Sequence, residues 1–476
     1  MAERGSKRGA GAKRTGTSLA VWAVLAALLS LASGCCQLAP YRTPDGITDW
    51  QETAPPEATL AEKARFYEER IATRHLSPEG VLVYRRRVDD AELTSYGNLA
   101  DTPFHTGIYA AGQAARFAAT GDAAAREQVL RGLSGLELLM NVTGVRGLLA
   151  RNVSPARFAD AIDDDRWRES PTVPEFIWRS DVSKDQYAGF IHGLGLALAL
   201  VPDESVRRKV AALSSAAADH LIESDLRIVD ADGETTTFGD LRSTVFGLPK
   251  GVDSLLALAI ARVAALSTGD ARYEEFHARL LARGYVETAY WAHLSFFGSG
   301  NRVNDHMAYL ALTPLLLLLL EDDWKTRTDL RRAGRRSWAA VKDERNAFFA
   351  VVHAGLVGDA GDARRGDPPN SSAAAAAARA ALAEFPENKT ERPVDLTRPE
   401  AGLDFPRAFL NRSDCMPRSR VSIPLYLRVR SSSMWASDPY RLAGRLHGRE
   451  RTETTGADYL LAYWLARHFG IVAEGE

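Results

Sequence analysis

The chain has 476 residues and is nearly neutral, with 59 basic and 61 acidic side chains. A protein that binds nucleic acid would normally show a basic surplus, so this balance argues against a nucleic-acid partner. Three cysteines are too few for a disulfide framework or a cysteine-built zinc site, and we expect no metal and no cofactor.

The first 34 residues have the pattern of an export signal. Five basic residues precede an apolar stretch at 19–31, which is too short to span a bilayer as a helix. The segment 31–35, Leu-Ala-Ser-Gly-Cys, resembles the lipobox of bacterial lipoproteins, although the usual Leu stands one place early. We therefore expect cleavage before Cys35 and lipid on this cysteine. An ordinary signal peptide or an uncleaved anchor is the alternative.

The cysteine at position 36, where an aspartate would favour inner-membrane retention, points by resemblance to the outer membrane of a Gram-negative cell envelope. Removal of residues 1–34 takes away five basic side chains and one acidic one, which leaves a net charge near −6. An acidic exported protein suits neutral sugars, peptides or cations better than polyanions. The composition says nothing about the oligomeric state.

Residues 35–59 are rich in Pro, Thr and Ala and are predicted to form a flexible tether. Beyond them, apolar periodicity and Gly, Asp and Pro signals predict an all-α domain over 60–476. The predicted helix pairs span 104–119 with 123–140, 185–200 with 204–223, 252–267 with 271–293, 304–320 with 326–341, and 345–357 with 372–384. A helix at 60–74 and another at 455–469 could close these pairs into a ring of six hairpins.

Three further segments complete this outline. Residues 226–238 contain Asp-Ala-Asp-Gly, a turn signal that predicts a small β-hairpin. The apolar run that starts at Met307 has the length of a buried core helix rather than of a membrane span. Residues 385–450 are rich in Pro and Arg and are expected to form a long irregular loop over one face of the ring. The Gly-Asp pairs at 121–122 and 269–270 follow similar helical sequences and predict the same helix end and helix start.

Several short segments, in this order, resemble the six-hairpin glycosidase-like superfamily of (α/α)6 toroids. They lie at 101–109, 143–144, 150–151, 178–186 with Gly189, 230–233, 304–306, 344–346 and 459–464. The superfamily includes glycoside hydrolases, some polysaccharide lyases and sugar epimerases. More narrowly, the chain is similar to an uncharacterised group of bacterial exported proteins. The resemblance implies a toroid whose inner helices start at one mouth, and it leaves the activity open.

Polar residues gather at three predicted helix starts. The side chains that we expect to be catalytic, on one mouth around one concave pocket, are Asp101, His105, Asp181, Asp185, Asn304 and Asp305. The side chains that we expect to bind substrate are Arg151, Trp178, Gln186, His192 and His306. The structural alternatives are that Asp185 and Asp305 only cap helices, that the histidines and Arg151 have structural partners, and that Trp178, Trp435 and Tyr440 are core residues rather than sugar platforms.

These residues suggest a carbohydrate-active enzyme. An inverting glycosidase needs two carboxyl groups, and Asp181 with Asp101 or Asp305 would supply them in an order that the sequence leaves open. A lyase or epimerase would instead use His105, Asn304 and Arg151. The alternative is a non-catalytic envelope lipoprotein that binds a glycan or a protein. Carboxylates in an open polar funnel would favour the enzyme, and a funnel filled by apolar side chains or by the 385–450 loop would favour the binding protein.

Overall fold

The computed structural model describes residues 55–476, apart from 88–99, 163, 294, 297–298, 321–322, 360–370, 389, 392–393, 397–408, 411–416, 420, 429–430 and 445–451. The predicted signal peptide, Cys35 and most of the predicted tether lie outside the described residues.

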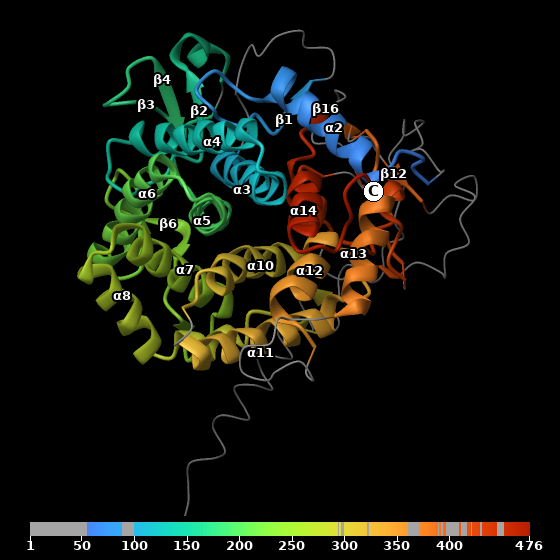
Figure 1. Ribbon diagram of the computed structural model, residues 1–476. Helices are drawn as coiled ribbons and strands as arrows, with labels where there is room; N and C mark the ends of the chain where they lie inside the picture. Colours follow the sequence, from blue (N-terminus) through green and yellow to red (C-terminus); the bar gives the residue numbers. More distant parts are fainter. Residues whose placement is uncertain are drawn as a thin grey trace, which may run out of the picture.

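The described chain is a ring of paired helices, which confirms the predicted all-α toroid (Figure 1). The inner helices are α3 (Thr102–Thr120), α5 (Lys184–Leu200), α7 (Gly251–Thr268), α10 (Arg302–Leu317), α12 (Ala347–Val352) and α14 (Ala457–His468). The outer helices are α2 (Leu60–Arg70), α4 (Ala123–Asn141), α6 (Glu204–Glu223), α8 (Ala271–Ala282) with α9 (Tyr285–Ala289), α11 (Trp324–Val341) and α13 (Ser372–Glu384). Short π-helical turns, η2 (Ile71–His75) and η5 (His353–Val357), extend α2 and α12.

The first and last of these helices lie side by side. The hydroxyl of Tyr459 in α14 donates to the carbonyl oxygen of Leu60 in α2 at 2.8 Å. The indole N–H of Trp464 donates to Glu68 at 3.0 Å. Helix α14 also packs against α3, the first inner helix, which closes the ring. Segments nearly 400 residues apart in sequence therefore share one packed interface.

The Gly-Asp pairs mark helix ends as the sequence predicted. Gly121 and Gly269 end α3 and α7 in the left-handed conformation, with φ of 70° and 69°. The next residue in each case, Asp122 or Asp270, accepts a hydrogen bond from a backbone N–H in the first turn of the following helix. At both positions the Gly-Asp pair thus ends an inner helix and caps the outer helix that follows it.

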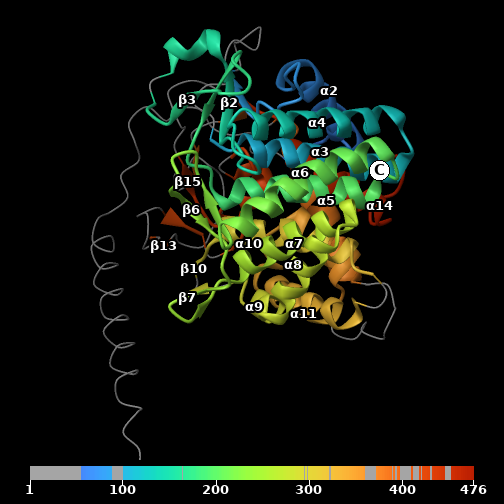
Figure 2. The same ribbon diagram turned by 90° about the vertical axis from the view of Figure 1, so that its left-hand side faces the viewer.

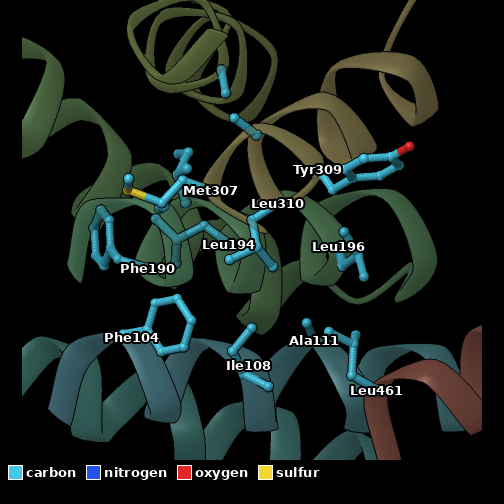
Figure 3. Packing of buried hydrophobic residues seen from close by; sticks show 14 of the residues in the cluster. Phe104, Ile108, Ala111, Phe190, Leu194, Leu196, Met307, Tyr309, Leu310 and Leu461 are labelled. Atoms are coloured by element: carbon cyan, nitrogen blue, oxygen red, sulfur yellow. The ribbon is translucent and has the colours of Figure 1, made fainter. Parts of the chain in front are cut away.

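The middle of the ring is filled rather than open. A methyl group added at Gly107 of α3 would lie 2.0 Å from the carbonyl oxygen of Gly189 in α5, and one added at Gly195 would lie 2.3 Å from Pro314 of α10. Helix α5 is therefore wedged between α3 and α10. Figure 3 shows the apolar side chains that meet there, which include Phe104, Ile108, Phe190, Leu194, Met307 and Leu310.

Among the residues that the structure describes, one helix is long and apolar enough to cross a membrane. Helix α7 has the length and composition of a membrane span, but most of it is buried among other helices, as expected for a core helix. The apolar run that starts at Met307 lies in α10 and is likewise buried, as predicted.

Short strands gather at one end of the helices (Figure 2). The predicted hairpin is present as β5 (Arg227–Val229) and β6 (Thr235–Asp240). The sequence did not predict the sheet of β2 (Asn152–Pro155), β4 (Phe176–Arg179) and β3 (Trp167–Glu169), or the hairpin of β7 (Thr244–Val245) and β8 (Leu248–Pro249). These strands have two to four residues, too few for alternation to be visible in the sequence.

The described part of the predicted 385–450 loop contains no α-helix, because α13 ends at Glu384. Its elements are β11 (Thr390–Glu391), β12 (Val394–Asp395), β13 (Phe409–Leu410), β14 (Pro417–Arg418), η7 (Leu425–Leu427), η8 (Met434–Ala436) and β15 (Ala443–Gly444). The remaining short elements of the molecule are β1 (Arg85–Arg87), η3 (Ala156–Ala161), β9 (Ser295–Phe296), β10 (Ser299–Gly300) and β16 (Thr452–Thr454). Figure 2 places β6, β7, β10, β13 and β15 along the same end of the ring.

Candidate functional site at the mouth of the ring

The inner helices run in the same direction, so their first turns share one end of the ring, which we call the mouth. Lys184 and Asp253, in the first turns of α5 and α7, form an ion pair of 2.9 Å. Further along, His192 of α5 is 2.8 Å from the carbonyl oxygen of Leu310 in α10. Residues in the first turn of one inner helix contact the first turn of the next, and residues further along contact residues further along. The helices are therefore parallel, and their starts lie together.

Asp101 precedes α3 at this mouth and does not cap the helix with its side chain. Its carboxylate instead accepts a hydrogen bond of 2.7 Å from the amide of Gln186, and it lies 3.8 Å from Arg151. Burial, together with the negative charge of Asp185, raises the pKa of Asp101 to about 6. The side chain is nevertheless 36% exposed. It is a proton donor and acceptor near neutral pH that a ligand can reach.

Asp185 and Asp305 are not the N-caps of their helices, so the capping alternative fails for both. Ser183 caps α5 and shares a capping box with Gln186, and its hydroxyl also contacts the Asp185 carboxylate. Asn301 caps α10 through its side chain, and Asp305 lies one turn further on. These two carboxylates are thus not N-caps, although as acidic groups in the first turn both favour the helix start through its dipole.

Asp181 and Arg151 hold the loops of the mouth together. Asp181 has a φ of 58°, a left-handed backbone that is strained for a residue with a side chain. Its carboxylate accepts hydrogen bonds from the backbone N–H and the hydroxyl of Thr237 in β6. Arg151 donates to the carbonyl oxygens of Ala100 and Asp181, each at 2.9 Å. We therefore assign positioning roles to Asp181 and Arg151, in place of the predicted catalytic and substrate-binding roles.

Four other predicted site residues lie inside the protein. The ring of His105 stacks on Tyr84 with centroids 4.0 Å apart. Trp178 is buried on β4. His192 and His306 are buried around Phe348, and burial lowers the pKa of His192 to about 4 and of His306 to about 3. Enclosed rings of this kind suit packing, so we do not retain Trp178, His192 and His306 as substrate contacts or His105 as a catalytic residue.

A second polar cluster lies beside Asp305. Arg302 forms ion pairs with Asp305 at 3.2 Å and with Glu344, and His293 lies 2.7 Å from the same Asp305 carboxylate. Burial raises the pKa of Glu344 to about 8 against the opposing effect of Arg302. The sequence reasoning did not select Arg302, His293 or Glu344. A signal was present, because 344–346 is one of the segments of the superfamily resemblance.

The 421–444 segment covers this second cluster. Trp435 is buried, and its indole N–H donates to the carbonyl oxygen of Asp458 at 2.7 Å. The amide of Asn346 in turn donates to the carbonyl oxygen of Trp435 at 2.9 Å. Trp435 is therefore a core residue rather than a sugar platform, and Tyr440 is partly buried. The predicted loop closes the α10, α12 and α14 sector of the mouth.

A cavity of about 780 Å³ opens in the neighbouring sector, between β7–β8 and the starts of α7 and α10. Asn304 and Asp305 line it, together with Lys184, Asp253 and Trp291. Asp101, His105, Asp181 and Asp185 do not. This cavity is therefore lined by two of the six catalytic candidates, and we divide the mouth into an Asp101–Asp185 sector and a cavity sector. Across the residues that the structure describes, no three His, Cys, Asp or Glu side chains group as a metal site would require.

No protein-family model and no curated protein matches the chain. Among solved structures it is similar to a glycoside hydrolase family 9 protein from Bacteroides ovatus, with 9% identity, a TM-score of 0.40, and coverage of 87% of this chain and 83% of that chain. A family 76 mannosidase from Bacteroides thetaiotaomicron VPI-5482 aligns with 10% identity, a TM-score of 0.22, and coverage of 68% and 96%. A family 76 glycoside hydrolase from a bovine Bacteroides thetaiotaomicron strain aligns with 12% identity, a TM-score of 0.22, and coverage of 69% and 77%. With TM-scores this low, the toroid rests on the helix contacts of this chain, and no residue role is transferred from these proteins.

Proposed function

We propose that this protein is a carbohydrate-active enzyme of the cell envelope that hydrolyses a glycosidic bond at the Asp101–Asp185 sector of the mouth. The observation that carries the proposal is the state of Asp101. It is a partly exposed carboxyl group with its pKa raised to about 6, beside a second carboxylate, at a helix start where its side chain makes no capping hydrogen bond. A carboxyl group with a raised pKa beside a second carboxylate is typical of acid–base sites.

The chemistry assigned to the pair is hydrolysis by water. Protonated Asp101 gives its proton to the glycosidic oxygen as the bond from that oxygen to the anomeric carbon breaks. Asp185 takes a proton from the water whose oxygen forms the new bond to the anomeric carbon. Gln186 holds the Asp101 carboxylate through its amide, and Arg151 fixes the loops before α3 and α5. Asp181 is not a member of the pair, because Thr237 occupies its carboxylate.

The test is a product-release screen of the purified protein against polysaccharides and peptidoglycan, repeated with Asp101→Asn. We expect release from one substrate class and a loss of roughly 100-fold or more in the variant, the usual contribution of a general acid. Asp122→Asn, which keeps a capping side chain at the start of α4 away from the mouth, is the matched control. Release that is unchanged in Asp101→Asn would contradict the assignment.

The filled centre of the ring favours a second candidate, a non-catalytic glycan-binding protein. Substrate cannot enter between α3, α5 and α10, so we place the ligand of such a protein at the mouth. A binding protein would retain oligosaccharides at the mouth without releasing product. Binding that persists in Asp101→Asn, together with no product from any substrate in the screen, would select this candidate over the enzyme.

The envelope location in this proposal rests on the lipobox-like sequence that ends at Cys35. We expect Cys35→Ala to abolish lipidation and membrane retention while the body stays folded, because the described fold begins beyond residue 54. Metabolic labelling with palmitate, followed by membrane fractionation, checks this. A Cys36→Ala variant is the control, and continued labelling of the Cys35→Ala/Cys36→Ala double variant would rule out the anchor.

A further inference from the structure

The cavity sector of the mouth has a predominantly apolar wall. The cavity of about 780 Å³ lies between β7–β8, the start of α7, the turn after α9 and the start of α10. Its apolar lining comes from Val245, Leu248, Pro249, Val252, Trp291 and Ala292. This volume is within the usual range for a site that takes a whole small ligand. Water makes few hydrogen bonds to an apolar wall, so an apolar group that displaces this water would bind favourably.

Trp291 is held in place at the rim of this cavity. The guanidinium of Arg336 lies 4.2 Å from the centroid of its ring, and a nitrogen of the same guanidinium donates to the carbonyl oxygen of Tyr290 at 3.1 Å. Trp291 is still 42% exposed, and Leu248 across the rim is 47% exposed. Large apolar side chains that line a cavity and remain in contact with water mark a surface that a ligand can cover.

The charged groups of the cavity are paired with one another. Lys184 and Lys250 lie 2.9 Å and 3.6 Å from the buried carboxylate of Asp253. Asp305 is paired with Arg302 and His293. A charged ligand would have to compete with these pairs, whereas a neutral hydroxylated group can hydrogen-bond to them without breaking them. Asn301 and Asn304 add further polar contacts at the same end.

The tip of the β7–β8 hairpin extends the apolar surface. Phe246 and Gly247 both have positive φ values, 48° and 77°, as in the tight turns that join such hairpins. Glycine tolerates this backbone and phenylalanine does not, yet the Phe246 side chain is 99% exposed. A strained aromatic residue that packs against nothing is consistent with a tip that contacts an apolar ligand or surface outside the protein.

From this geometry we propose that the cavity binds the alkyl chain of a neutral amphiphile, with its hydroxylated head group at Asn304 and Asp305. The ligand of the mouth is then a glycolipid. The claim that the head group is a sugar rests on the proposed function. The claim that the cavity binds an alkyl chain does not. A long flexible chain suits the mainly aliphatic wall, and a neutral head group suits the paired charges.

The experiment measures binding of n-alkyl β-D-glucosides with chains of four to twelve carbons, below their micellar concentrations. The full chain carries Cys35→Ala so that no detergent is needed. We expect affinity to rise by roughly fourfold for each methylene group that enters the cavity. A bromine-labelled dodecyl chain should quench tryptophan fluorescence, and Trp291→Phe should remove most of the quenching. Leu248→Asp and Val245→Asp, both at partly exposed positions, should each lower affinity at least tenfold.

Phe238→Ser is the matched control, since this exposed aromatic residue of β6 does not line the cavity. Affinity that is independent of chain length, or equal in Leu248→Asp and the unaltered chain, overturns the proposal. Laurate is measured beside dodecyl glucoside to separate the two claims. Binding of laurate without the glucoside supports an alkyl site and counts against the sugar ligand. Binding of short glucosides with no gain in affinity from longer chains supports a sugar ligand and counts against the alkyl site.

Discussion

The centre of the ring and its mouth are built from the same inner helices, but the centre is apolar and tightly packed whereas the mouth is polar. At the centre, α3, α5 and α10 approach so closely that glycine is required where they touch, and apolar side chains fill the remaining space (Figure 3). At the mouth, one or two turns away, the same helices present carboxylates, amides and basic groups. The difference shows that α3, α5 and α10 leave no open funnel between them, and it is the reason why we place the proposed chemistry at the mouth.

The two regions also treat ionisable groups differently. Imidazoles in the centre are held neutral by burial, which lowers the pKa of His306 to about 3. At the mouth, burial and neighbouring charge raise the pKa of Asp101 to about 6. The first effect keeps the core imidazoles uncharged near neutral pH. The second leaves a carboxyl group that exchanges protons in that range.

The largest expected effect comes from opening the ring. Deletion of 457–476 removes α14 and exposes faces of α2, α3 and α12 that are built to be buried. We expect the truncated protein to lose its cooperative thermal transition, as measured by calorimetry and near-ultraviolet circular dichroism. A truncated chain that melts like the full-length protein would contradict the closed ring.

A single methyl group should test the tight centre. In Gly189→Ala, the new methyl would lie 2.4 Å from the Phe104 backbone, so α3 and α5 must separate. We expect a loss of about 3 kcal/mol in the free energy of unfolding, measured in urea. Gly112→Ala is the control on α3, because its nearest neighbour is 3.3 Å away, and it should change stability by less than about 1 kcal/mol. Equal effects of the two substitutions would refute the account of the centre.

A smaller effect concerns Glu344 beneath the 421–444 segment. Its pKa is raised to about 8 in the fold, so the folded state holds its proton after the unfolded chain has lost it. Stability should therefore fall as pH rises from the unfolded value of 4.5 to about 8, by up to about 1.4 kcal/mol for each pH unit. Between pH 7.5 and 8.5, where imidazoles with the ordinary pKa of 6.5 are roughly 90% or more neutral in the unfolded chain as well, Glu344→Gln should remove this decline. Glu69→Gln, at an exposed site on α2, should keep it. A decline that persists in Glu344→Gln would assign it to another group.

Local sequence chemistry was sufficient to locate most of the helices, although the predicted helix 271–293 is instead α8 and α9, which the left-handed Gly284 separates. Helix ends such as Gly121 and Gly269 carry their own signal in the next residue, and the periodic apolar runs span the helices that are observed. The direction of the inner helices followed from the hairpin pattern, which is why Asp101, Asp185 and Asp305 were expected on one mouth. The division of that mouth into two sectors was not predictable, because it depends on where the β7–β8 hairpin and the 421–444 segment lie.

Individual site residues were harder to predict for the same reason. Asp181 has the sequence context of a site residue, but its left-handed backbone and its bonds to Thr237 depend on a hairpin more than 50 residues away. Glu344 becomes a perturbed carboxyl only because Arg302 and a distant loop enclose it. Residue type and spacing identify helix starts, whereas burial by remote segments decides which of their carboxylates can act.

The titration of Asp101, followed by carbon-13 NMR of its carboxyl group, tests the central claim most directly. Asp101→Asn provides the resonance assignment. We predict a midpoint near pH 6, and a lower midpoint in Asp185→Asn, where the neighbouring negative charge is removed. A midpoint at or below the ordinary aspartate value of 3.8, unchanged in Asp185→Asn, would show that the mouth holds no carboxyl group prepared for proton transfer.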